Sequence, residues 1–289
     1  MKFIFIKDHR EEFPIAAMCR VLAVSKSGFY RWSKSPEGKR ERYRHELGEA
    51  IARVHEANRG VYGSPRVRHA LLGEGRKVSR NTVAKVMKQR GIKARTHRRF
   101  KVRTTDSNHA HPIAANVLDR KFTADKINRV WLTDITYIPT DEGFLYLAGV
   151  MDMCSRKIIG WSMAEHMRSE LACDALNMAL AARRPGSGEG GLLHHSDRGV
   201  QYAGGEYQTL LAARGITVSM SGVGNCYDNA PTESLWGKLK TELVYLEHFA
   251  TREQARAAIF DYIECFYNRT RLHSSLGYLS PEQFEAALT

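Results

Sequence analysis

The chain has 289 residues, of which 43% are hydrophobic and 26% charged, and its formal net charge is +13. This composition is that of a soluble globular protein of about two domains, and it excludes a membrane protein because no segment approaches the roughly 20 apolar residues that cross a bilayer. The five cysteines, at positions 19, 154, 173, 226 and 265, form no CxxC pair, which argues against a disulfide framework and a zinc finger.

The positive charge is confined to the first part of the chain. Residues 1–124 contain 29 Lys or Arg and 11 Asp or Glu, whereas residues 125–289 contain 15 and 20. Between Arg76 and Arg103 there are twelve bases and no acid. Such a block is typical of a surface that binds a polyanion, although a solvated basic face or a disordered arm has the same composition.

The first basic segment, residues 1–35, predicts a short helix-turn-helix-like unit. Within it, residues 13–32 predict a helix, a turn at Ala23–Val24, and a short second helix that carries Lys26 and Arg31. Any two capped helices resemble this motif, so the pattern alone leaves a structural role open.

A second helix-turn-helix unit is predicted within residues 40–96. One helix covers 64–75, and a second covers 77–91, where Ser79 is a good N-cap and Gly91 a good stop. Val83, Val86, Met87 and Arg90 share the inward face by helical spacing. The side chains that this leaves to meet DNA are Arg80, Asn81, Thr82, Lys85 and Gln89.

Residues 97–124 show little periodicity and predict a basic linker that lies along DNA phosphates. Beyond it we expect an α/β core over residues 125–245, followed by a helical extension over 246–289. The predicted elements are a strand at 129–139, two strands within 144–164, a helix at 169–184, a strand from 192 to Asp197, a helix, a strand at 217–221, and helices at 229–243 and 251–267.

One glycine pattern in this half is misleading. Gly186, Gly188 and Gly191 satisfy GxGxxG, but this loop leaves a helix and enters a strand, the reverse of the order that a dinucleotide site requires. No GxxxxGK[ST] motif occurs either, so the sequence does not support nucleotide hydrolysis.

Three acids are candidates for chemistry. Asp134 lies in the middle of a strand, Asp197 at the exit of a later strand, and Glu233 in the first turn of a helix. Each has a structural explanation of its own: a satisfied core aspartate, a turn residue, and a charge that favours the helix dipole. His194 and His195, which are adjacent on a strand and point to opposite faces, are interpreted as structural or supporting residues.

Together the three acids predict a metal site. They converge only if the sheet and a covering helix bring them together, and clustered carboxylates repel unless cations lie between them. Oxygen ligands of this kind suit Mg²⁺, and two ions per site would support in-line phosphoryl transfer. Lys240, seven residues after Glu233, projects within about 20° of it on a helix and would hold a DNA phosphate.

At these residues the chain resembles a known family. The segments "WLTDITYI", "HSDRGVQY", "DNAPTESLWGKLKTE" and "YNRTRLHSSLGYLSPEQF" are similar to those of the OrfB-type transposases of two-frame bacterial insertion sequences, whose core is similar to that of retroviral integrases. The resemblance runs from about residue 13 to the end of the chain.

The resemblance implies a ribonuclease-H-like, mixed five-stranded sheet with helices on both faces. It also implies DDE-type chemistry at Asp134, Asp197 and Glu233 with Mg²⁺ or Mn²⁺. The implied reaction is hydrolysis at the element's ends, followed by attack of the freed 3′-hydroxyls on another strand, without a covalent protein–DNA intermediate. Unlike retroviral integrases, the chain has no zinc-binding His/Cys domain at its beginning.

Two other functions fit parts of the sequence: a non-catalytic DNA-binding regulator, and a metal-dependent nuclease that only hydrolyses. The expected partners are DNA, further copies of the chain on that DNA, and a protein or fusion from the first reading frame. No membrane partner is expected. We expect a bacterial cytoplasmic protein associated with the nucleoid.

Overall fold

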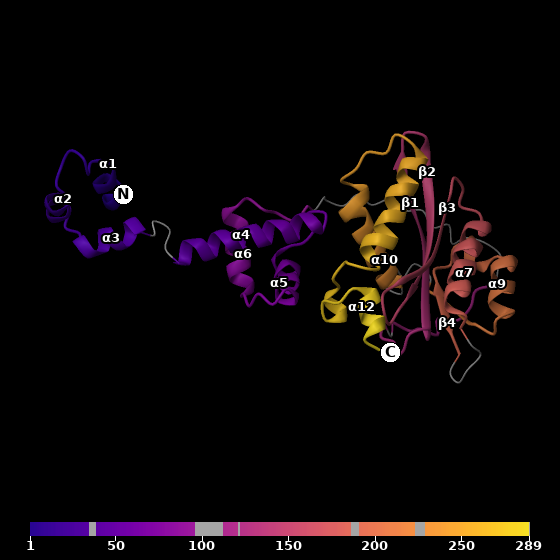
Figure 1. Cartoon of the computed structure of the whole chain (residues 1–289). Helices are drawn as coiled ribbons and strands as arrows, with labels where there is room; N and C mark the ends of the chain where they lie inside the picture. Colours follow the sequence, from indigo (N-terminus) through magenta and orange to yellow (C-terminus); the bar gives the residue numbers. More distant parts are fainter. Residues whose placement is uncertain (35–38, 96–111, 121, 186–190, 223–228, 289) are drawn as a thin grey trace. The chain divides into compact units, whose positions relative to one another are not determined.

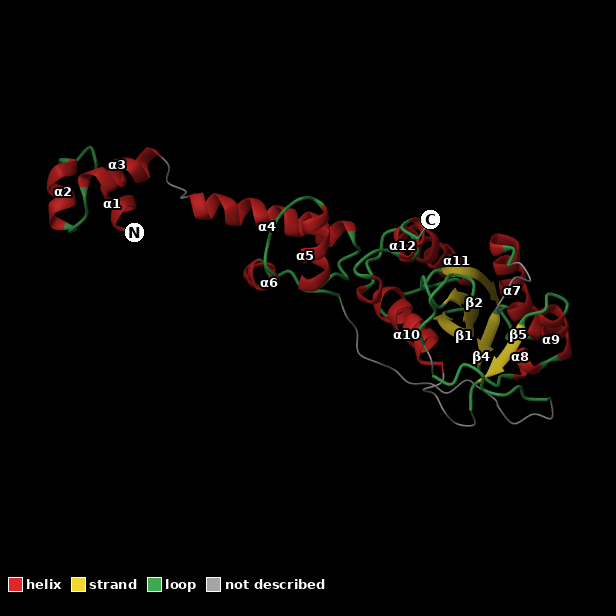
Figure 2. Ribbon diagram, turned by 90° about the horizontal axis from the view of Figure 1, so that it is seen from below, coloured by secondary structure: helices red, strands yellow, loops and turns green. Residues whose placement is uncertain are grey.

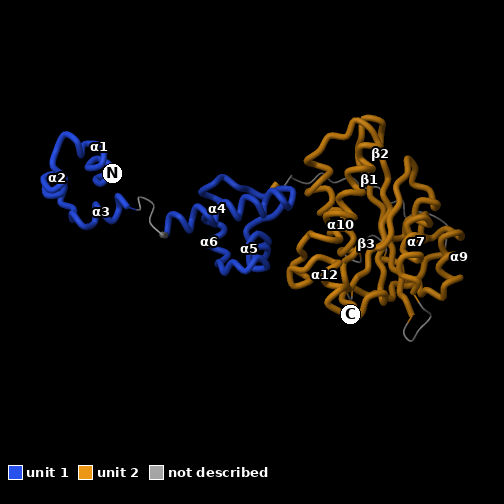
Figure 3. Tube along the Cα trace, in the orientation of Figure 1, with its two compact units in different colours: residues 1–94 blue, residues 95–289 orange. Residues whose placement is uncertain are grey.

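The structure is a computed structural model that describes residues 1–34, 39–95, 112–120, 122–185, 191–222 and 229–288. The chain divides into two compact units, Met1–Ala94 and Arg95–Thr289 (Figure 3). The glycine loop at 186–190 and Cys226 lie outside the described residues. Within the described residues no helix is both long and apolar enough to cross a membrane.

The first three helices form a small cluster with its own apolar core. They are α1 (Lys2–Asp8), α2 (Ile15–Val21) and α3 (Lys26–Lys34). The buried side chains are Ile6, Met18, Cys19 and Phe29, and Phe3 and Trp32 pack against them. Helices α2 and α3 agree with the predicted pair, whereas α1 was not predicted.

The next three helices contain the second predicted pair. They are α4 (Lys39–Ala57), α5 (Ser64–Gly73) and α6 (Arg80–Gln89). Ser79 caps α6 as predicted, because its hydroxyl accepts the Thr82 N–H at 3.1 Å. Arg90 reaches α4, where it pairs with Glu49 at 2.7 Å and lies over Gly48, whose missing Cβ leaves room for the guanidinium.

The second unit contains the predicted mixed five-stranded sheet, in the order β3-β2-β1-β4-β5. Its strands are β1 (Val130–Thr140), β2 (Gly143–Asp152), β3 (Ile158–Ala164), β4 (Leu193–Ser196) and β5 (Thr217–Met220). Strand β2 pairs antiparallel with β1 and β3, whereas β4 pairs parallel with β1 and β5. The sheet is thus assembled from an antiparallel meander and two crossover strands.

Helices cover both faces of this sheet (Figures 1 and 2). On one side lie α7 (Ser169–Arg183), α8 (Val200–Ala203) and α9 (Gly205–Ala212). They enclose the main core with Trp131 of β1 and Ala148 and Val150 of β2. On the other side lie α10 (Ala230–Leu239), α11 (Arg252–Phe260) and α12 (Pro281–Ala286).

The end of the predicted linker differs from the expectation. The N–H groups of Val117 and Leu118 donate to the Ser219 hydroxyl of β5 at 2.9 and 3.1 Å, and Leu118 is only 3% exposed. This end of the linker therefore packs on the core, whereas residues 97–111 of the predicted linker lie outside the described residues. Only a few residues of this segment contact β5, and a contact that short leaves no periodic pattern in the sequence.

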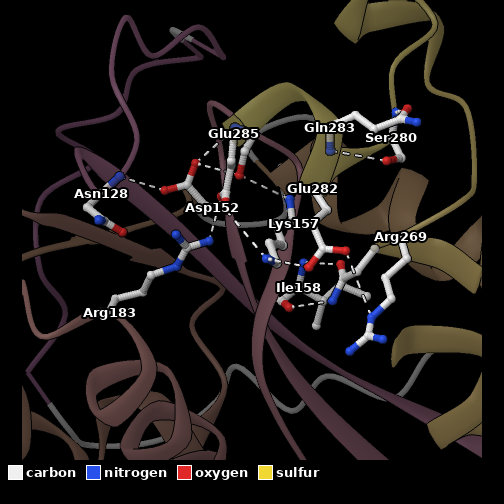
Figure 4. A network of polar contacts seen from close by, with 12 residues as sticks. Asn128, Asp152, Lys157, Ile158, Arg183, Arg269, Ser280, Glu282, Gln283 and Glu285 are labelled. Atoms are coloured by element: carbon white, nitrogen blue, oxygen red, sulfur yellow. Dashed lines mark hydrogen bonds and ion pairs between the residues drawn. The ribbon is translucent and has the colours of Figure 1, made fainter. Parts of the chain in front are cut away.

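The C-terminal segment packs against β3, the edge strand of the sheet, where that strand begins. The side-chain amide of Asn268 accepts the Ile158 N–H at 3.0 Å and donates to the Ile158 carbonyl at 2.9 Å, as a neighbouring strand would. Ion pairs from α12 continue this contact, with Glu285 between Arg183 and Lys157 (Figure 4). In the sequence, the short 3₁₀ helix η4 (Ser274–Leu276) lies between Asn268 and α12.

Two helices predicted as continuous change to π-helix before they end. Helix α10 continues as η2 (Lys240–Val244), and α11 continues as η3 (Asp261–Tyr267). Glu242 of η2 accepts the Tyr262 hydroxyl at 3.0 Å and forms a two-point ion pair with Arg271. The bond to Tyr262 joins the two π segments, and Arg271, which is 1% exposed, pairs with Glu242 inside the protein.

We expect Arg271→Ala to lower the free energy of unfolding by about 3–5 kcal/mol, because it leaves the Glu242 carboxylate buried without its cation. Urea denaturation followed by circular dichroism measures this. The control is Arg269→Ala, which removes an exposed guanidinium 3.9 Å from Glu282 and should cost less than about 1 kcal/mol. Equal losses in the two variants would contradict a structural role for the buried pair.

Candidate active site

Asp134 lies in the middle of β1, half-buried on the face that α10 covers. Its cross-strand partner in β2 is Gly149, and directly paired residues point to the same face. The Asp134 carboxylate accepts the N–H of the next residue, Ile135, at 2.9 Å. This bond to the backbone fixes the side chain close to the strand.

Asp197 follows β4 directly and lies beside Asp134. In the parallel pairing of β1 with β4, Leu132 is the partner of His195. Asp134 and Asp197 each lie two residues beyond this pair, Asp197 just past the end of β4, and the charge of Asp197 acts on the Asp134 carboxyl. The Asp197 carboxylate accepts the Gly199 N–H at 2.9 Å, which turns the chain away after the strand.

A buried chain of hydrogen bonds supports the end of β4. The Ser219 hydroxyl already accepts two backbone N–H groups, so it donates to His195 Nδ1 at 2.9 Å. His195 therefore carries its proton on Nε2 and donates to the Ser221 hydroxyl at 3.2 Å. Ser221 in turn donates to the carbonyl of Ser196, next to Asp197, at 3.3 Å. Through this series of hydrogen bonds, His195 supports the backbone next to Asp197, in line with the supporting role expected from the sequence.

His194 points the other way, as expected for adjacent residues on a strand. Its Nε2 lies 2.9 Å from the hydroxyl of Tyr207 in α9, and both rings are buried in the main core. Burial lowers the pKa of His194 to about 3, so it stays neutral. It is a structural residue.

Helix α10 carries Glu233, and Lys240 begins its π-helical continuation η2. Pro231 lies in its first turn, as predicted, and Asn229 is the N-cap residue, with its amide 3.5 Å from the Thr133 carbonyl. Further along, the Trp236 ring occupies the space that a side chain at Gly149 would fill. The helix thus lies directly on the strand pair that carries Asp134.

The charges of the four residues act on one another. Burial, followed by the charge of Asp197 and then that of Glu233, raises the pKa of Asp134 well above its ordinary value. Lys240 opposes this rise. Burial lowers the pKa of Lys240 itself, against the attraction of Asp134. The residues that the sequence singled out are therefore brought together, and Glu233, which is exposed, forms the outer side of the group.

Two neighbours of this group were not predicted. The Lys240 ammonium lies 4.4 Å from the centroid of the Tyr137 ring, a cation–π contact, and the edge of Phe144 packs against the same ring at 5.0 Å between centroids. The second is Asn229, which is 6% exposed and whose amide oxygen has no hydrogen-bond partner among the described residues. No sequence pattern marks either contact, because both depend on how α10 lies against the sheet.

The acids are near one another without forming a compact ligand set. Among the described residues, no three His, Cys, Asp or Glu side chains are gathered closely enough to be recognised as a metal site. The site is an open group of acids whose charges interact.

Apart from Lys240, the residues predicted to contact DNA lie on α6, in the other unit. Arg80, Asn81, Lys85 and Gln89 are exposed. Thr82 is half-buried, and its hydroxyl lies 2.9 Å from that of Ser79 in the N-cap. Its position in the first turn makes it part of the cap.

The chain is similar to known proteins over almost its whole length. It is 43% identical over 288 residues to the transposase InsF of insertion sequence IS3A from Escherichia coli K12, which covers 99% of this chain and 98% of the relative. The chain belongs to the transposases of IS3-type insertion sequences. It matches two Integrase core domain families over residues 124–226 and 233–287, and an HTH-like domain over residues 42–100.

The chain is also similar to a second insertion-element protein and to a viral protein of known structure. The transposase is 42% identical over 267 residues to an uncharacterized 31 kDa protein of insertion element IS600 from Shigella sonnei, covering 92% of this chain and 97% of the relative. The simian T-cell lymphotropic virus intasome is similar at 16% identity with a TM-score of 0.47, over 81% of this chain and 73% of that one.

The family gives the activity. The protein is a DNA transposase with an integrase core that acts by the DDE mechanism, and it binds DNA. A non-catalytic regulator and a purely hydrolytic nuclease, the two alternative readings of the sequence, are not the functions of this family.

The contact between Gly149 and Trp236 generates a prediction. A Cβ at position 149 would lie 2.6 Å from the ring, so Gly149→Ala forces α10 away from the sheet. We expect the free energy of unfolding to fall by about 1–3 kcal/mol and strand transfer by at least about tenfold, since Glu233 and Lys240 move with the helix. Thermal denaturation and an oligonucleotide joining assay measure the two effects.

The control lies on the same helix. A Cβ at Gly237 meets open space, so Gly237→Ala should leave activity unchanged and raise stability by about 0.5–1 kcal/mol. Adding Trp236→Phe to Gly149→Ala should recover part of both losses. Wild-type behaviour of Gly149→Ala would show that the helix does not depend on this contact.

Proposed function

We propose that Asp134, Asp197 and Glu233 are the catalytic carboxylates of this transposase and that they hold two Mg²⁺ or Mn²⁺ ions. The observation that carries the proposal is the parallel pairing of β1 with β4, in which Leu132 and His195 are partners two residues before Asp134 and Asp197. The effect of Glu233 on the pKa of Asp134 adds the third acid to the group.

The donor set fits a hard divalent cation. All three residues offer carboxylate oxygens, the ligands that Mg²⁺ prefers, and the group is open enough for DNA phosphates to complete the coordination. Asn229 adds a buried amide oxygen without a partner among the described residues, at the N-cap of the helix that carries Glu233. When bound, such ions activate the attacking oxygen and stabilise the leaving oxygen of a phosphoryl transfer.

The chain's own residues place the DNA for two successive reactions. In the first, water attacks a phosphodiester at the element's end, and the P–O3′ bond breaks to free a 3′-hydroxyl. In the second, that 3′-oxygen attacks a target phosphorus while the target's own P–O3′ bond breaks. Lys240 holds a phosphate oxygen beside the acids, and the Tyr137 ring limits where its ammonium can go.

DNA recognition belongs to the other unit. We infer that α6 enters the major groove and contacts DNA through its first turn and outward face, with Arg80, Asn81, Thr82, Lys85 and Gln89. Because two element ends and a target must be held at once, we expect the transposase to act as a homo-oligomer on DNA. We expect a first-frame protein or fusion to assist it, and the nucleoid of a bacterial cytoplasm to be its location.

Loss of any one acid should abolish the chemistry but not DNA binding. We expect Asp134→Asn, Asp197→Asn and Glu233→Gln each to lower cleavage and strand transfer by orders of magnitude. Each substitution removes the negative charge of one proposed metal ligand and leaves the size of the side chain nearly unchanged. Labelled element-end duplexes, incubated with Mg²⁺ and resolved on denaturing gels, report both nicking and joining.

Asp174→Asn is the matched control, since it removes an exposed carboxylate on α7, across the sheet from α10. It should behave as wild type. Strand transfer that survives in the Asp134→Asn variant would refute the assignment, and nicking without joined products in the wild type would reduce the activity to hydrolysis.

Divalent ions should stabilise the protein through the acids. A ligand at 100 times its Kd raises the free energy of unfolding by about 2.7 kcal/mol. For a core of this size, that corresponds to a rise in Tm of several degrees. We expect this rise with Mg²⁺ or Mn²⁺ in the wild type, at constant ionic strength, and none in Asp134→Asn/Asp197→Asn. Differential scanning calorimetry measures it, and an equal rise in the double variant would place the ions elsewhere.

A further inference from the structure

Residues 1–34 form a module that none of the matched families covers. The HTH-like match begins at residue 42, and the integrase matches lie further on. Yet α1, α2 and α3 enclose a core of their own, in which Ile6, Met18, Cys19 and Phe29 are each at most 6% exposed. A module with its own core, outside the residues that the family matches cover, calls for a function of its own.

Helices α2 and α3 are joined by a tight turn. The Val24 N–H donates to the Cys19 carbonyl at 3.0 Å, across a left-handed Ala23 with φ 51°, which closes α2 with a Schellman-type cap. The Ser25 hydroxyl then accepts the Gly28 N–H at 3.0 Å and starts α3. Four residues thus reverse the chain between two short helices, which is the arrangement of a helix-turn-helix.

The outward face of α3 is polar and basic. Phe29 is buried and Trp32 half-buried against the module's core. The opposite face consists of exposed residues at helical spacing: Lys26, Ser27, Tyr30, Arg31 and Lys34. Residues 15–34 contain four bases and no acid, whereas the module's three acids all lie between positions 8 and 12.

The chemistry of this face favours duplex DNA over a protein partner. The exposed apolar side chains of the module, such as Ile4, Phe13 and Val21, belong to α1, the loop after it, and α2 rather than to α3. On α3 the one large exposed ring is Tyr30, which is 44% exposed and carries a hydroxyl. A helix about 10–12 Å in diameter fits the major groove, which is about 12 Å wide.

We propose that α3 is a second DNA-reading helix of the transposase, with Lys26, Tyr30, Arg31 and Lys34 contacting the terminal duplex of the element. The inference extends the DNA-binding part of the proposed function and rests on it, but not on the roles of the acids. Two reading modules in one chain would recognise a longer stretch of the element's end than α6 alone.

The test is DNA binding by the full chain in an Asp134→Asn background, which prevents cleavage and makes the result independent of the catalytic assignment. The probe is a duplex carrying the terminal inverted repeat of the chain's own insertion sequence. We expect Lys26→Ala/Arg31→Ala to weaken binding at least about tenfold at 0.15 M salt and to reduce the slope of log K against log salt by about 2, since each lost phosphate contact accounts for about 0.9.

The matched control is Lys7→Ala/Arg10→Ala, which removes two exposed charges of the same module outside α3. Binding by the control should stay within twofold of the parent. Circular dichroism should show that both variants keep their helices, as expected for surface changes. Equal weakening in the two variants would mean a general charge effect and would overturn the proposal.

Footprinting separates the two modules. Lys26→Ala/Arg31→Ala should lose hydroxyl-radical protection over one stretch of the repeat and keep the stretch that Arg80→Ala/Lys85→Ala loses. An unchanged footprint in the α3 variant would show that α3 does not contact DNA. Loss of the same stretch in both variants would show that it does not read a site of its own.

Discussion

The parallel pairing of β4 with β1 is the contact on which the rest of this transposase depends. It joins segments about sixty residues apart in sequence and makes Asp197 the neighbour of Asp134. Both carboxylates are then anchored by backbone N–H groups within two residues. Asp134 is therefore positioned by the sheet itself, and Asp197 by the turn that directly follows β4.

The third acid is positioned by helix packing. Helix α10 lies on the sheet because Gly149 leaves room for Trp236, and its far end is held by the buried Glu242–Arg271 pair. The π-helical turn that begins at Lys240 widens the helix at the point where Glu242 turns inward. The C-terminal segment thus contributes to the site without supplying a residue to it, since it fixes the helix from behind.

Much of this arrangement could be predicted from the sequence because it has local causes. The strand around Asp134, the strand that ends at Asp197, and the capped helix of Glu233 each follow from alternation, apolar runs or cap residues. The spacing of Glu233 and Lys240 follows from helix geometry alone. The five-stranded sheet came from family resemblance together with these local patterns.

The features that escaped prediction are contacts between distant segments. Tyr137 under Lys240, Gly149 under Trp236, and Arg271 beside Glu242 leave no periodic signal, because each depends on how two finished elements pack. The two π-helical segments belong to the same class. Helices α1 and α4 were missed for a simpler reason: the apolar residues of α1 form one short run without helical spacing, and those of α4 are interrupted by charges.

The attachment of Val117 and Leu118 to Ser219 sets where the catalytic half can be separated from the rest. A fragment that began at residue 124, where the similarity to integrase cores starts, would uncover the apolar site that Leu118 fills. The Ser219 hydroxyl would also lose its two backbone donors. The constraint that fixes the proton of His195 on Nε2 would then be lost as well. The segment that packs on the catalytic half therefore includes Val117 and Leu118, which precede the part of the chain that matches integrase cores.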